Sequence, residues 1–313
     1  PAVRTQGLAD RRLVAYTSEQ AHSSVVRAVE LLGLGSENLR SLPVDANFAM
    51  QTGALEAAIA ADRSAGLQPF CVIGTAGTVN TGAIDDLDRI ADLGAAQKLW
   101  FHVDGAFGAL CILSDALRPR LKGIERADSL GFDFHKWMHV QYDAGCVLVR
   151  DGALHRAAYT THPAYLERLP RGLAGGDPWP CDFGPELSRS FRALKIWFTF
   201  KQHGVRRLGL LIEHNCAQAH YLADRIGREP ELQILAPVTL TIVCFRFLQP
   251  GLSDRELNQL NEDIVADLQE SGIAAPSTSR IHNALAIRVN ITNHRTRFSD
   301  MELRGDAVLD AAH

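Results

Sequence analysis

The stretch Leu99-Trp100-Phe101-His102-Val103-Asp104-Gly105-Ala106 decides the fold class of this chain. A mostly apolar run, Leu99–Val103, ends at a carboxylate, Asp104. Apolar runs of this kind are typical of strands that helices cover on both faces. Ligands gather beyond the carboxyl ends of the strands in open α/β sheets, so we expect Asp104 to face a binding site.

The rest of the chain up to about residue 150 repeats this pattern. Helical segments separate the apolar runs: Ser23–Leu32 has a one-sided apolar face and stops at Gly33, and Asp85 and Asp86 open another helix. The alternation predicts an α/β fold with a mainly parallel sheet. The further strand candidates are Leu13–Tyr16, Phe70–Gly74 and Gly145–Val149, and a short run, Ser129–Phe134, precedes Lys136.

A different pattern follows the Pro- and Gly-rich stretch Thr161–Pro185, which we interpret as a lid. Ser253 and Glu256 form a capping box, which predicts that a helix begins there. We therefore predict a large domain over residues 1–200 and a smaller α+β domain over 201–313. The other elements expected here are helices at Leu187–His203, Ile212–Ile226 and Asp300–Asp310, a half-exposed strand at Thr239–Phe247 and a strand at Ala284–Ile291.

Composition narrows the class of protein. A net charge of −4 gives no electrostatic reason to expect nucleic acid as a partner. No apolar run approaches the ~20 residues that span a bilayer, so a membrane is not expected as a partner either. The six cysteines are scattered without a C-x-x-C pair, so the sequence suggests neither a metal site nor a disulfide framework. We expect a cytoplasmic protein.

Lys136 is the second residue of chemical interest. It follows Asp104 by 32 residues and lies between aromatic residues, in Phe134-His135-Lys136-Trp137. A desolvated lysine has a lowered pKa and acts as a Schiff-base nucleophile. Spacing alone leaves an alternative open, in which Lys136 is a surface lysine and Asp104 caps a helix.

The order of several segments resembles the group II pyridoxal-phosphate-dependent amino-acid decarboxylases, most closely the aromatic-L-amino-acid branch. The resemblance covers almost the whole chain and implies a fold-type I transferase-like α/β architecture. It also implies pyridoxal 5'-phosphate as cofactor and a homodimer. The matching segments are Tyr16–Ser24, Asn47–Met50, His102–Asp104, His135–Trp137 and Arg192–Trp197.

The resemblance implies roles for individual residues. Lys136 would form the Schiff base with the cofactor, and Asp104 would pair with the pyridine nitrogen. His22 would stack on one face of the ring and Ala106 would touch the other. His135 would lie beside the phosphate.

Two further roles follow from the same resemblance. The segment Gly74-Thr75-Ala76-Gly77-Thr78 resembles the family's loop beneath the cofactor, and a threonine there, Thr78, or a backbone amide could hydrogen-bond the ring hydroxyl. Val79 stands where many relatives have a second threonine. Tyr165 matches the family's mobile-loop tyrosine and would deliver a proton to the substrate α-carbon after decarboxylation. Its position in the Thr161–Pro185 stretch fits a lid that excludes water.

Two departures from the family limit the prediction. No Ser/Gly-rich phosphate-binding turn lies before residue 16, which predicts either a fragment of a longer enzyme or an N-terminally truncated relative with impaired cofactor binding. Asp133 stands where animal enzymes of the aromatic branch have asparagine, and an acid there would repel the phosphate unless it turns away.

The expected function is decarboxylation of an L-amino acid, aromatic in the closest branch, to the amine and carbon dioxide. Transamination or aldehyde synthesis with the same cofactor is an alternative reaction. Relatives that make aldehydes usually replace the tyrosine or the histidine, whereas this chain has both Tyr165 and His22. A catalytically impaired homologue is the third possibility, because the phosphate-binding turn is not visible.

Overall fold

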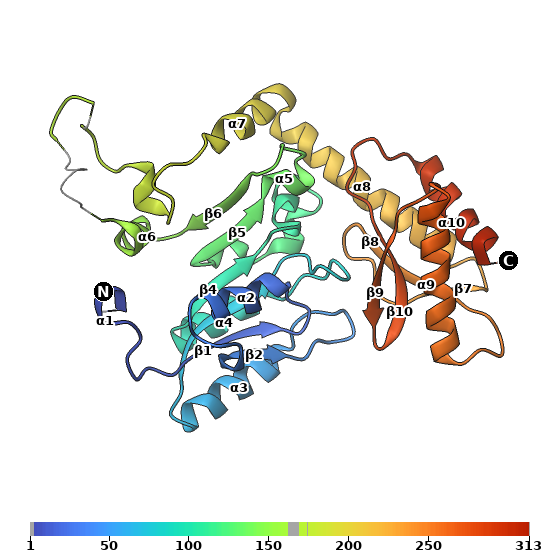
Figure 1. Ribbon diagram of the computed structural model, residues 1–313, viewed down its shortest axis with the longest axis horizontal. Coiled ribbons are helices and arrows are strands. Elements are labelled where there is room, and N and C mark those ends of the chain that lie inside the picture. Colours follow the sequence, from blue (N-terminus) through green and yellow to red (C-terminus); the bar gives the residue numbers. More distant parts are fainter. Residues whose placement is uncertain (1–2, 162–168, 174, 313) are drawn as a thin grey trace.

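The computed structural model describes residues 3–161, 169–173 and 175–312 of the chain. Two sheets lie side by side in it, one of six strands and one of four (Figure 1). The large sheet contains β1 (Leu13–Ser18), β2 (Leu39–Leu42), β3 (Gln68–Thr75), β4 (Trp100–Asp104), β5 (Ser129–Asp133) and β6 (Gly145–Val149). The small sheet contains β7 (Leu232–Ile234), β8 (Ile242–Phe247), β9 (Ser277–Ile281) and β10 (Ala284–Asn290).

The large sheet has the strand order β2-β1-β3-β4-β5-β6. Every neighbouring pair from β2 to β5 is parallel, and only β6 runs antiparallel to its neighbour. The predicted mainly parallel α/β sheet is therefore confirmed. Thr75 pairs with Asp104 in the register of β3 and β4, so the carboxyl ends of these strands lie side by side.

One face of the large sheet carries the main hydrophobic core. Leu55, Ile90 and Ile212, from three different helices, pack there against Tyr16 and Phe101 of the strands. All five side chains are almost completely buried. The helices of the chain are α1 (Val3–Gln6), α2 (Ser23–Leu31), α3 (Thr52–Ser64), α4 (Leu87–Gln97), α5 (Phe134–Trp137), α6 (Gly152–Tyr159), α7 (Arg192–His203), α8 (Val205–Ile226), α9 (Asp254–Glu270) and α10 (Phe298–Ala312).

The opposite face of the large sheet is thinly covered. Its buried cluster contains only Ala15, Cys71 and Ile73, and α2 buries a single residue, Val29. A groove of about 730 Å³ runs along this face and reaches Asp104.

Helix α8 links the two units and runs in Figure 1 from the end of α7, beside the large sheet, across to the small sheet. Leu208 and Ile212 in its first half join the core of the large sheet, whereas Leu222 and Ile226 in its second half join the core of the small one. The helix lies so close to the large unit that a Cβ at Gly209 would collide with the carbonyl oxygen of Leu113. The boundary at residues 200/201 stays a prediction, because α8 packs into both cores.

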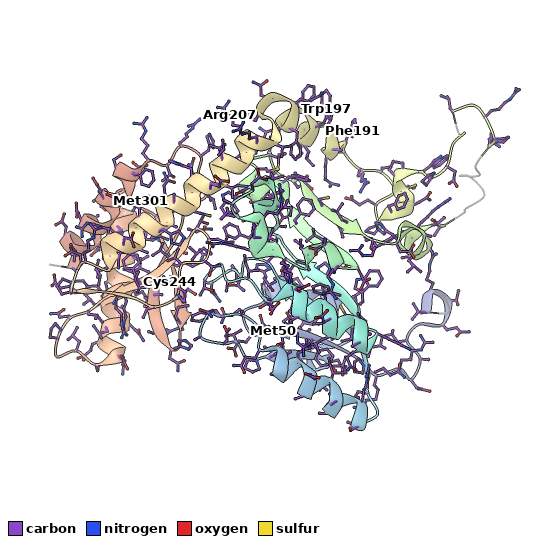
Figure 2. All side chains as sticks on the ribbon, turned by 180° about the vertical axis from the view of Figure 1, so that it is seen from behind. Met50, Phe191, Trp197, Arg207, Cys244 and Met301 are labelled. Atoms are coloured by element: carbon purple, nitrogen blue, oxygen red, sulfur yellow. The ribbon has the colours of Figure 1, made fainter. Side chains whose placement is uncertain are left out.

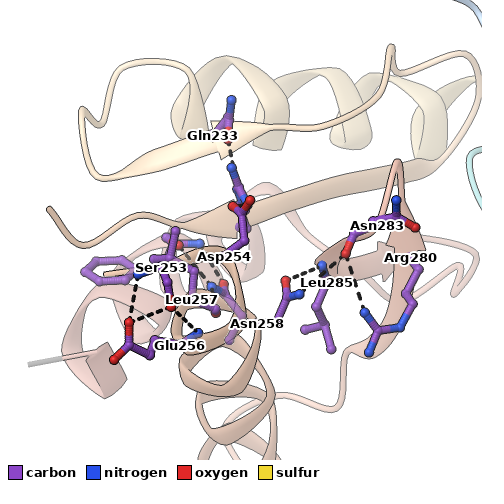
Figure 3. Close-up of polar contacts among 12 residues, drawn as sticks. Gln233, Ser253, Asp254, Glu256, Leu257, Asn258, Arg280, Asn283 and Leu285 are labelled. Atoms are coloured by element: carbon purple, nitrogen blue, oxygen red, sulfur yellow. Dashed lines mark hydrogen bonds and ion pairs between the residues drawn. The ribbon is translucent and has the colours of Figure 1, made fainter. Parts of the chain in front are cut away.

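The capping box at α9 is confirmed. Ser253 Oγ accepts a hydrogen bond from the Glu256 amide, and Glu256 Oε2 accepts one from the Ser253 amide (Figure 3). Just beyond this helix start, Asn258 Oδ1 accepts a hydrogen bond at 2.7 Å from the Leu285 amide of β10. The cap therefore fixes where the helix begins, and the asparagine ties the helix to the sheet.

Some expected elements differ from the observed ones. Helix α7 begins at Arg192 rather than Leu187, and α8 begins at Val205 rather than Ile212. The half-exposed strand predicted at Thr239–Phe247 is wrong. Its observed core, β8, is buried on both faces, because Val243 and Phe245 face α8 and α9 while Ile242 and Cys244 face the large unit. Elements that the sequence patterns did not indicate are the helices α1, α3, α5 and α6 and the strands β2, β7 and β9.

No helix in the described part of the chain is long and apolar enough to cross a membrane.

Candidate active site

A cavity of about 440 Å³ lies beyond the carboxyl ends of β3 and β4. Its lining includes every predicted site residue that the structure describes, whereas Tyr165 lies outside the described residues. Residues that are far apart along the chain thus line one cavity, as expected at the carboxyl edge of a parallel sheet. The predicted residues in the lining are His22, Thr78, Asp104, Ala106, His135 and Lys136.

Asp104 is the last residue of β4 and is half-buried. Its Oδ1 accepts a hydrogen bond at 3.1 Å from the Ala106 amide, which fixes the carboxylate at the cavity wall. Among the described residues, no donor is within hydrogen-bond distance of Oδ2. Oδ2 of the carboxylate can therefore accept a hydrogen bond from a protonated nitrogen of a ligand.

Lys136 lies in α5, a single turn that begins directly after β5. Its Nζ stands 3.0 Å from Asp133 Oδ2, and 39% of its side chain is exposed. The structure does not show the expected desolvation of this lysine, because its side chain is partly exposed and its amine pairs with a carboxylate. Asp133 has turned toward Lys136, so its charge is compensated.

His135 lies beside Lys136 on the same turn. The Ala144 amide donates to His135 Nδ1 at 3.0 Å, so a neutral ring carries its proton on Nε2. The ring also packs against Tyr142, with 4.2 Å between the ring centroids. Nε2 is 3.8 Å from Asp133 Oδ2, so Asp133 faces both basic side chains of the turn.

His22 caps α2 at the opposite side of the cavity. Its Nδ1 accepts a hydrogen bond from the Ser24 amide at 3.2 Å and contacts Ser24 Oγ at 2.8 Å. The prediction placed His22 at a strand-to-helix turn, and the structure confirms that position. The side chain is exposed, with its ring at the cavity.

Thr78 lines the cavity, but its hydroxyl is used inside the protein. Thr78 Oγ1 accepts from the Ala83 amide and bonds Thr81 Oγ1, both at 3.0 Å. Thr75 is the threonine whose Oγ1 is buried without a hydrogen-bond partner, and it lines the same cavity. The sequence analysis included Thr75 in the loop Gly74–Thr78 but assigned the contact with the cofactor to Thr78.

Asp85 holds this part of the cavity in place. The prediction made it a helix-opening charge, but Asp86 is the cap of α4 and Asp85 is buried. Its two carboxylate oxygens accept hydrogen bonds at 2.7 Å from the amides of Met50 and Thr75. Burial raises the pKa of Asp85 to about 6, against the lowering effect of the two amides.

The small unit supplies another wall, which the sequence patterns did not indicate. Ile242, Arg288, Asn290 and Thr292 all line the cavity. The Arg288 guanidinium donates to the carbonyl oxygens of Val79 and Asn80, and burial lowers its pKa. A single arginine within the apolar run of β10 was the available signal.

A thiol reinforces the same contact between the units. Cys244, on the side of β8 that faces the large unit (Figure 2), donates through Sγ to the Asn80 carbonyl oxygen at 3.3 Å. The loop that carries Thr78 is thus tied to two strands of the small sheet.

Comparison with known proteins identifies the family. The model of the pyridoxal-dependent decarboxylase conserved domain matches residues 1–248. The chain is 36% identical over 289 residues to an aromatic-L-amino-acid decarboxylase of Bacillus atrophaeus, covering 92% of this chain and 60% of the relative. It is 34% identical over 305 residues to histidine decarboxylase of Mus musculus, covering 96% of this chain and 44% of the relative.

A solved structure agrees with this result. The structure of Oryza sativa TDC with PLP and tryptamine superimposes with a TM-score of 0.93 at 26% identity, covering 99% of this chain and 65% of that one. The chain therefore spans less than two thirds of these three relatives. With its fold-type I architecture and its cluster of a lysine, a carboxylate and a histidine in one cavity, this chain belongs to the pyridoxal-dependent decarboxylase family.

Proposed function

We propose that the protein decarboxylates an L-amino acid with pyridoxal 5'-phosphate, which Lys136 attaches covalently through Nζ. The observation that carries this proposal is the meeting of Lys136, Asp104 and His22 in one cavity. These three side chains come from the ends of three different strand segments. Only the folded sheet brings them together.

The residues present suit the ring of this cofactor. Asp104 offers a free carboxylate oxygen to the ring nitrogen, and Thr75 offers a buried, unpartnered hydroxyl to a polar ring substituent. An unpaired buried hydroxyl is costly, so a ligand that bonds Thr75 Oγ1 gains affinity. Ala106 leaves room for a flat ring, and the His22 ring lies across the same cavity.

The cofactor, when bound, supplies a protonated pyridine ring that takes up the electron pair left when carbon dioxide departs. Asp104 holds the proton on the ring nitrogen through its carboxylate. Lys136 Nζ would hold the cofactor covalently. Asp133 Oδ2 lies 3.0 Å from Nζ and can serve as the counter-ion of the ammonium form of Lys136.

Tyr165 is proposed as the acid that returns a proton to the substrate α-carbon. A phenol hydroxyl suits this step, because it donates a proton without carrying a permanent charge into an apolar cavity. The proposal rests on the match of Pro163-Ala164-Tyr165-Leu166 to the mobile-loop segment of the family.

An aromatic L-amino acid is the substrate that we propose. The cavity has apolar and aromatic lining from Val79, Phe107, Tyr142 and Ile242, which suits a flat apolar side chain. The Arg288 guanidinium on the same wall favours an anionic substrate group. The relatives act on aromatic amino acids or on histidine, as their names state, and the homodimer and the cytoplasmic location stay predictions.

The test combines spectroscopy with product analysis. We expect the purified chain mixed with pyridoxal phosphate to show the near-visible absorption band of a lysine-bound cofactor, and Lys136→Ala to lack it completely. Carbon dioxide release is then measured with L-tryptophan, L-tyrosine, L-histidine and L-glutamate, and the aromatic substrates should be fastest. A wild-type chain without the band at saturating cofactor contradicts the proposal, and a band without carbon dioxide release contradicts decarboxylation.

A further inference from the structure

The turn that carries Lys136 cannot hold its own position. Helix α5 has four residues, too few to be stable without tertiary contacts. Trp137, the residue after Lys136, is 2% exposed. The Trp137 ring stacks on the Phe107 ring, with 4.8 Å between the ring centroids and an interplanar angle of 2°. Phe107 itself lines the cavity. The position of Lys136 therefore depends on what holds Trp137.

Trp137 is held by a buried asparagine on α8. Its indole Nε1 donates to Asn215 Oδ1 at 3.1 Å, and Asn215 is 1% exposed. An indole nitrogen can only donate, so the amide must present its oxygen to Trp137 and its nitrogen to acceptors on the other side. Asn215 Nδ2 has two acceptors there, Gln218 Oε1 at 3.2 Å and the Asn293 carbonyl oxygen at 3.3 Å.

Gln218 extends the network to the small unit. It is completely buried, and its Nε2 donates to the Thr296 carbonyl oxygen at 2.6 Å. Asn293 and Thr296 form one turn, because the Thr296 amide donates to the Asn293 carbonyl oxygen at 3.2 Å. The buried side-chain amides of Asn215 and Gln218 on α8 therefore hydrogen-bond both ends of the Asn293–Thr296 turn.

The same turn touches the lysine segment directly. His294 packs against His139, three residues beyond Lys136, with 4.7 Å between the ring centroids. The chain enters this turn from β10, and both Asn290 at the end of the strand and Thr292 just after it line the cavity. The Asn293–Thr296 turn thus meets the lysine segment at two points, directly through His294 and indirectly through α8.

We propose that Asn215 and Gln218 are positioning residues that fix Lys136, by tying Trp137 to the Asn293–Thr296 turn of the small unit. The inference rests on the proposed role of Lys136 as the cofactor lysine. It makes the order of the lysine turn depend on the docking of the small unit against α8. Neither amide touches the cavity, so their effect on Lys136 is indirect and passes through Trp137 and through the contact of His294 with His139.

The experiment compares two asparagines that are equally buried. Asn215→Leu keeps the size of the side chain and removes its hydrogen bonds to Trp137 and Asn293. Asn261→Leu is the matched control, because Asn261 is completely buried and bonds the Phe247 backbone in the small unit, away from Lys136. Trp137→Phe keeps the aromatic stack on Phe107 but removes the Nε1 donor.

Hydrogen exchange of residues 134–140 in the cofactor-free chain is the first measurement. We expect about tenfold faster exchange there in Asn215→Leu and in Trp137→Phe, and no change there in Asn261→Leu. The double variant Trp137→Phe/Asn215→Leu should be no faster than Asn215→Leu alone, because Asn215→Leu already removes the bond that Trp137→Phe removes. Equal effects of the two asparagine variants, or additive effects in the double variant, would overturn the inference.

The second measurement is the pH midpoint of the absorption band of the bound cofactor. A shift of the midpoint is expected in Asn215→Leu and Trp137→Phe and not in Asn261→Leu, because only the first two alter the setting of Lys136. If the wild-type chain shows no band, the proposed function fails, while the exchange experiment still decides the inference about the turn. If the band is normal and neither readout changes, the inference alone fails.

Discussion

Two turns face each other across the cavity, and they are held in opposite ways. The lysine turn, α5, has four residues, while α2 behind His22 has nine. The longer helix is nevertheless less buried. Of its nine residues α2 buries only Val29, whereas α5 buries Trp137 and the residues just after it, Met138 and Val140, are buried as well. The hold on a catalytic side chain therefore comes from tertiary packing and not from helix length.

The difference follows from the two faces of the large sheet. The lysine turn belongs to the main core, together with α8, whereas α2 lies on the thinly covered face with its groove of about 730 Å³. Residues that must keep one position are thus placed on the well-packed face. The histidine turn is held mainly by local bonds, such as the cap between His22 and Ser24.

The largest test of this comparison removes packing from one turn at a time. Met138 is 1% exposed and Leu31 is 83% exposed. Met138→Ala should lower the free energy of unfolding by about 2–5 kcal/mol, through lost burial and the cavity left behind. Leu31→Ala should change it by less than about 0.5 kcal/mol. Denaturant unfolding of both variants measures the difference, and similar effects in the two would show that the turns are held alike.

A second test concerns Asp85, which supports the floor of the cavity between the two turns. Asparagine offers a single acceptor oxygen, so in Asp85→Asn one of the amides of Met50 and Thr75 would face an NH₂ group. We expect this variant to be about 1–3 kcal/mol less stable than the wild type near pH 4.

The pH dependence of that difference has a definite sign. The pKa of Asp85 is about 6 in the folded chain and 3.8 ordinarily, so folding favours the protonated form. The stability contributed by the protonated carboxyl is fully present below about pH 4 and is lost as pH rises through 6. The stability difference between wild type and Asp85→Asn should therefore shrink between pH 4 and pH 7. A difference that grows over this range would contradict the raised pKa.

Sequence patterns located the candidate catalytic residues better than the residues that line and support the cavity around them. Asp104 and Lys136 were found because each follows an apolar strand and each matches a family segment. The sequence could not show that Thr75, and not Thr78, has the unpartnered hydroxyl, because this depends on the hydrogen bonds of the folded loop. Arg288 was missed because nothing local to β10 shows that it reaches a loop some 200 residues earlier.

The fold was predictable to a similar extent. Strands of the parallel sheet have continuous apolar runs and were recognised, and the cap at Ser253 marked α9 correctly. The exposure of β8 was predicted wrongly, since the alternation in Thr239–Phe247 does not show that a second unit covers the outer face. The short strand β2 contains Arg40 and Ser41 and has little strand character of its own. It forms because β1 lies beside it.

The smallest expected effect separates the two roles of His22, which both caps α2 and presents its ring to the cavity. Asparagine is a better helix cap than histidine, so His22→Asn should keep the free energy of unfolding or raise it by up to about 1 kcal/mol. The lost ring should weaken cofactor binding about tenfold, because an aromatic contact contributes about 0.5–1.5 kcal/mol. Fluorescence titration with pyridoxal phosphate measures the Kd. His22→Ala removes cap and ring together and should lose both stability and affinity. Unchanged affinity in His22→Asn would mean that the turn matters only as a cap, and the cavity would then be held and used from the lysine side alone.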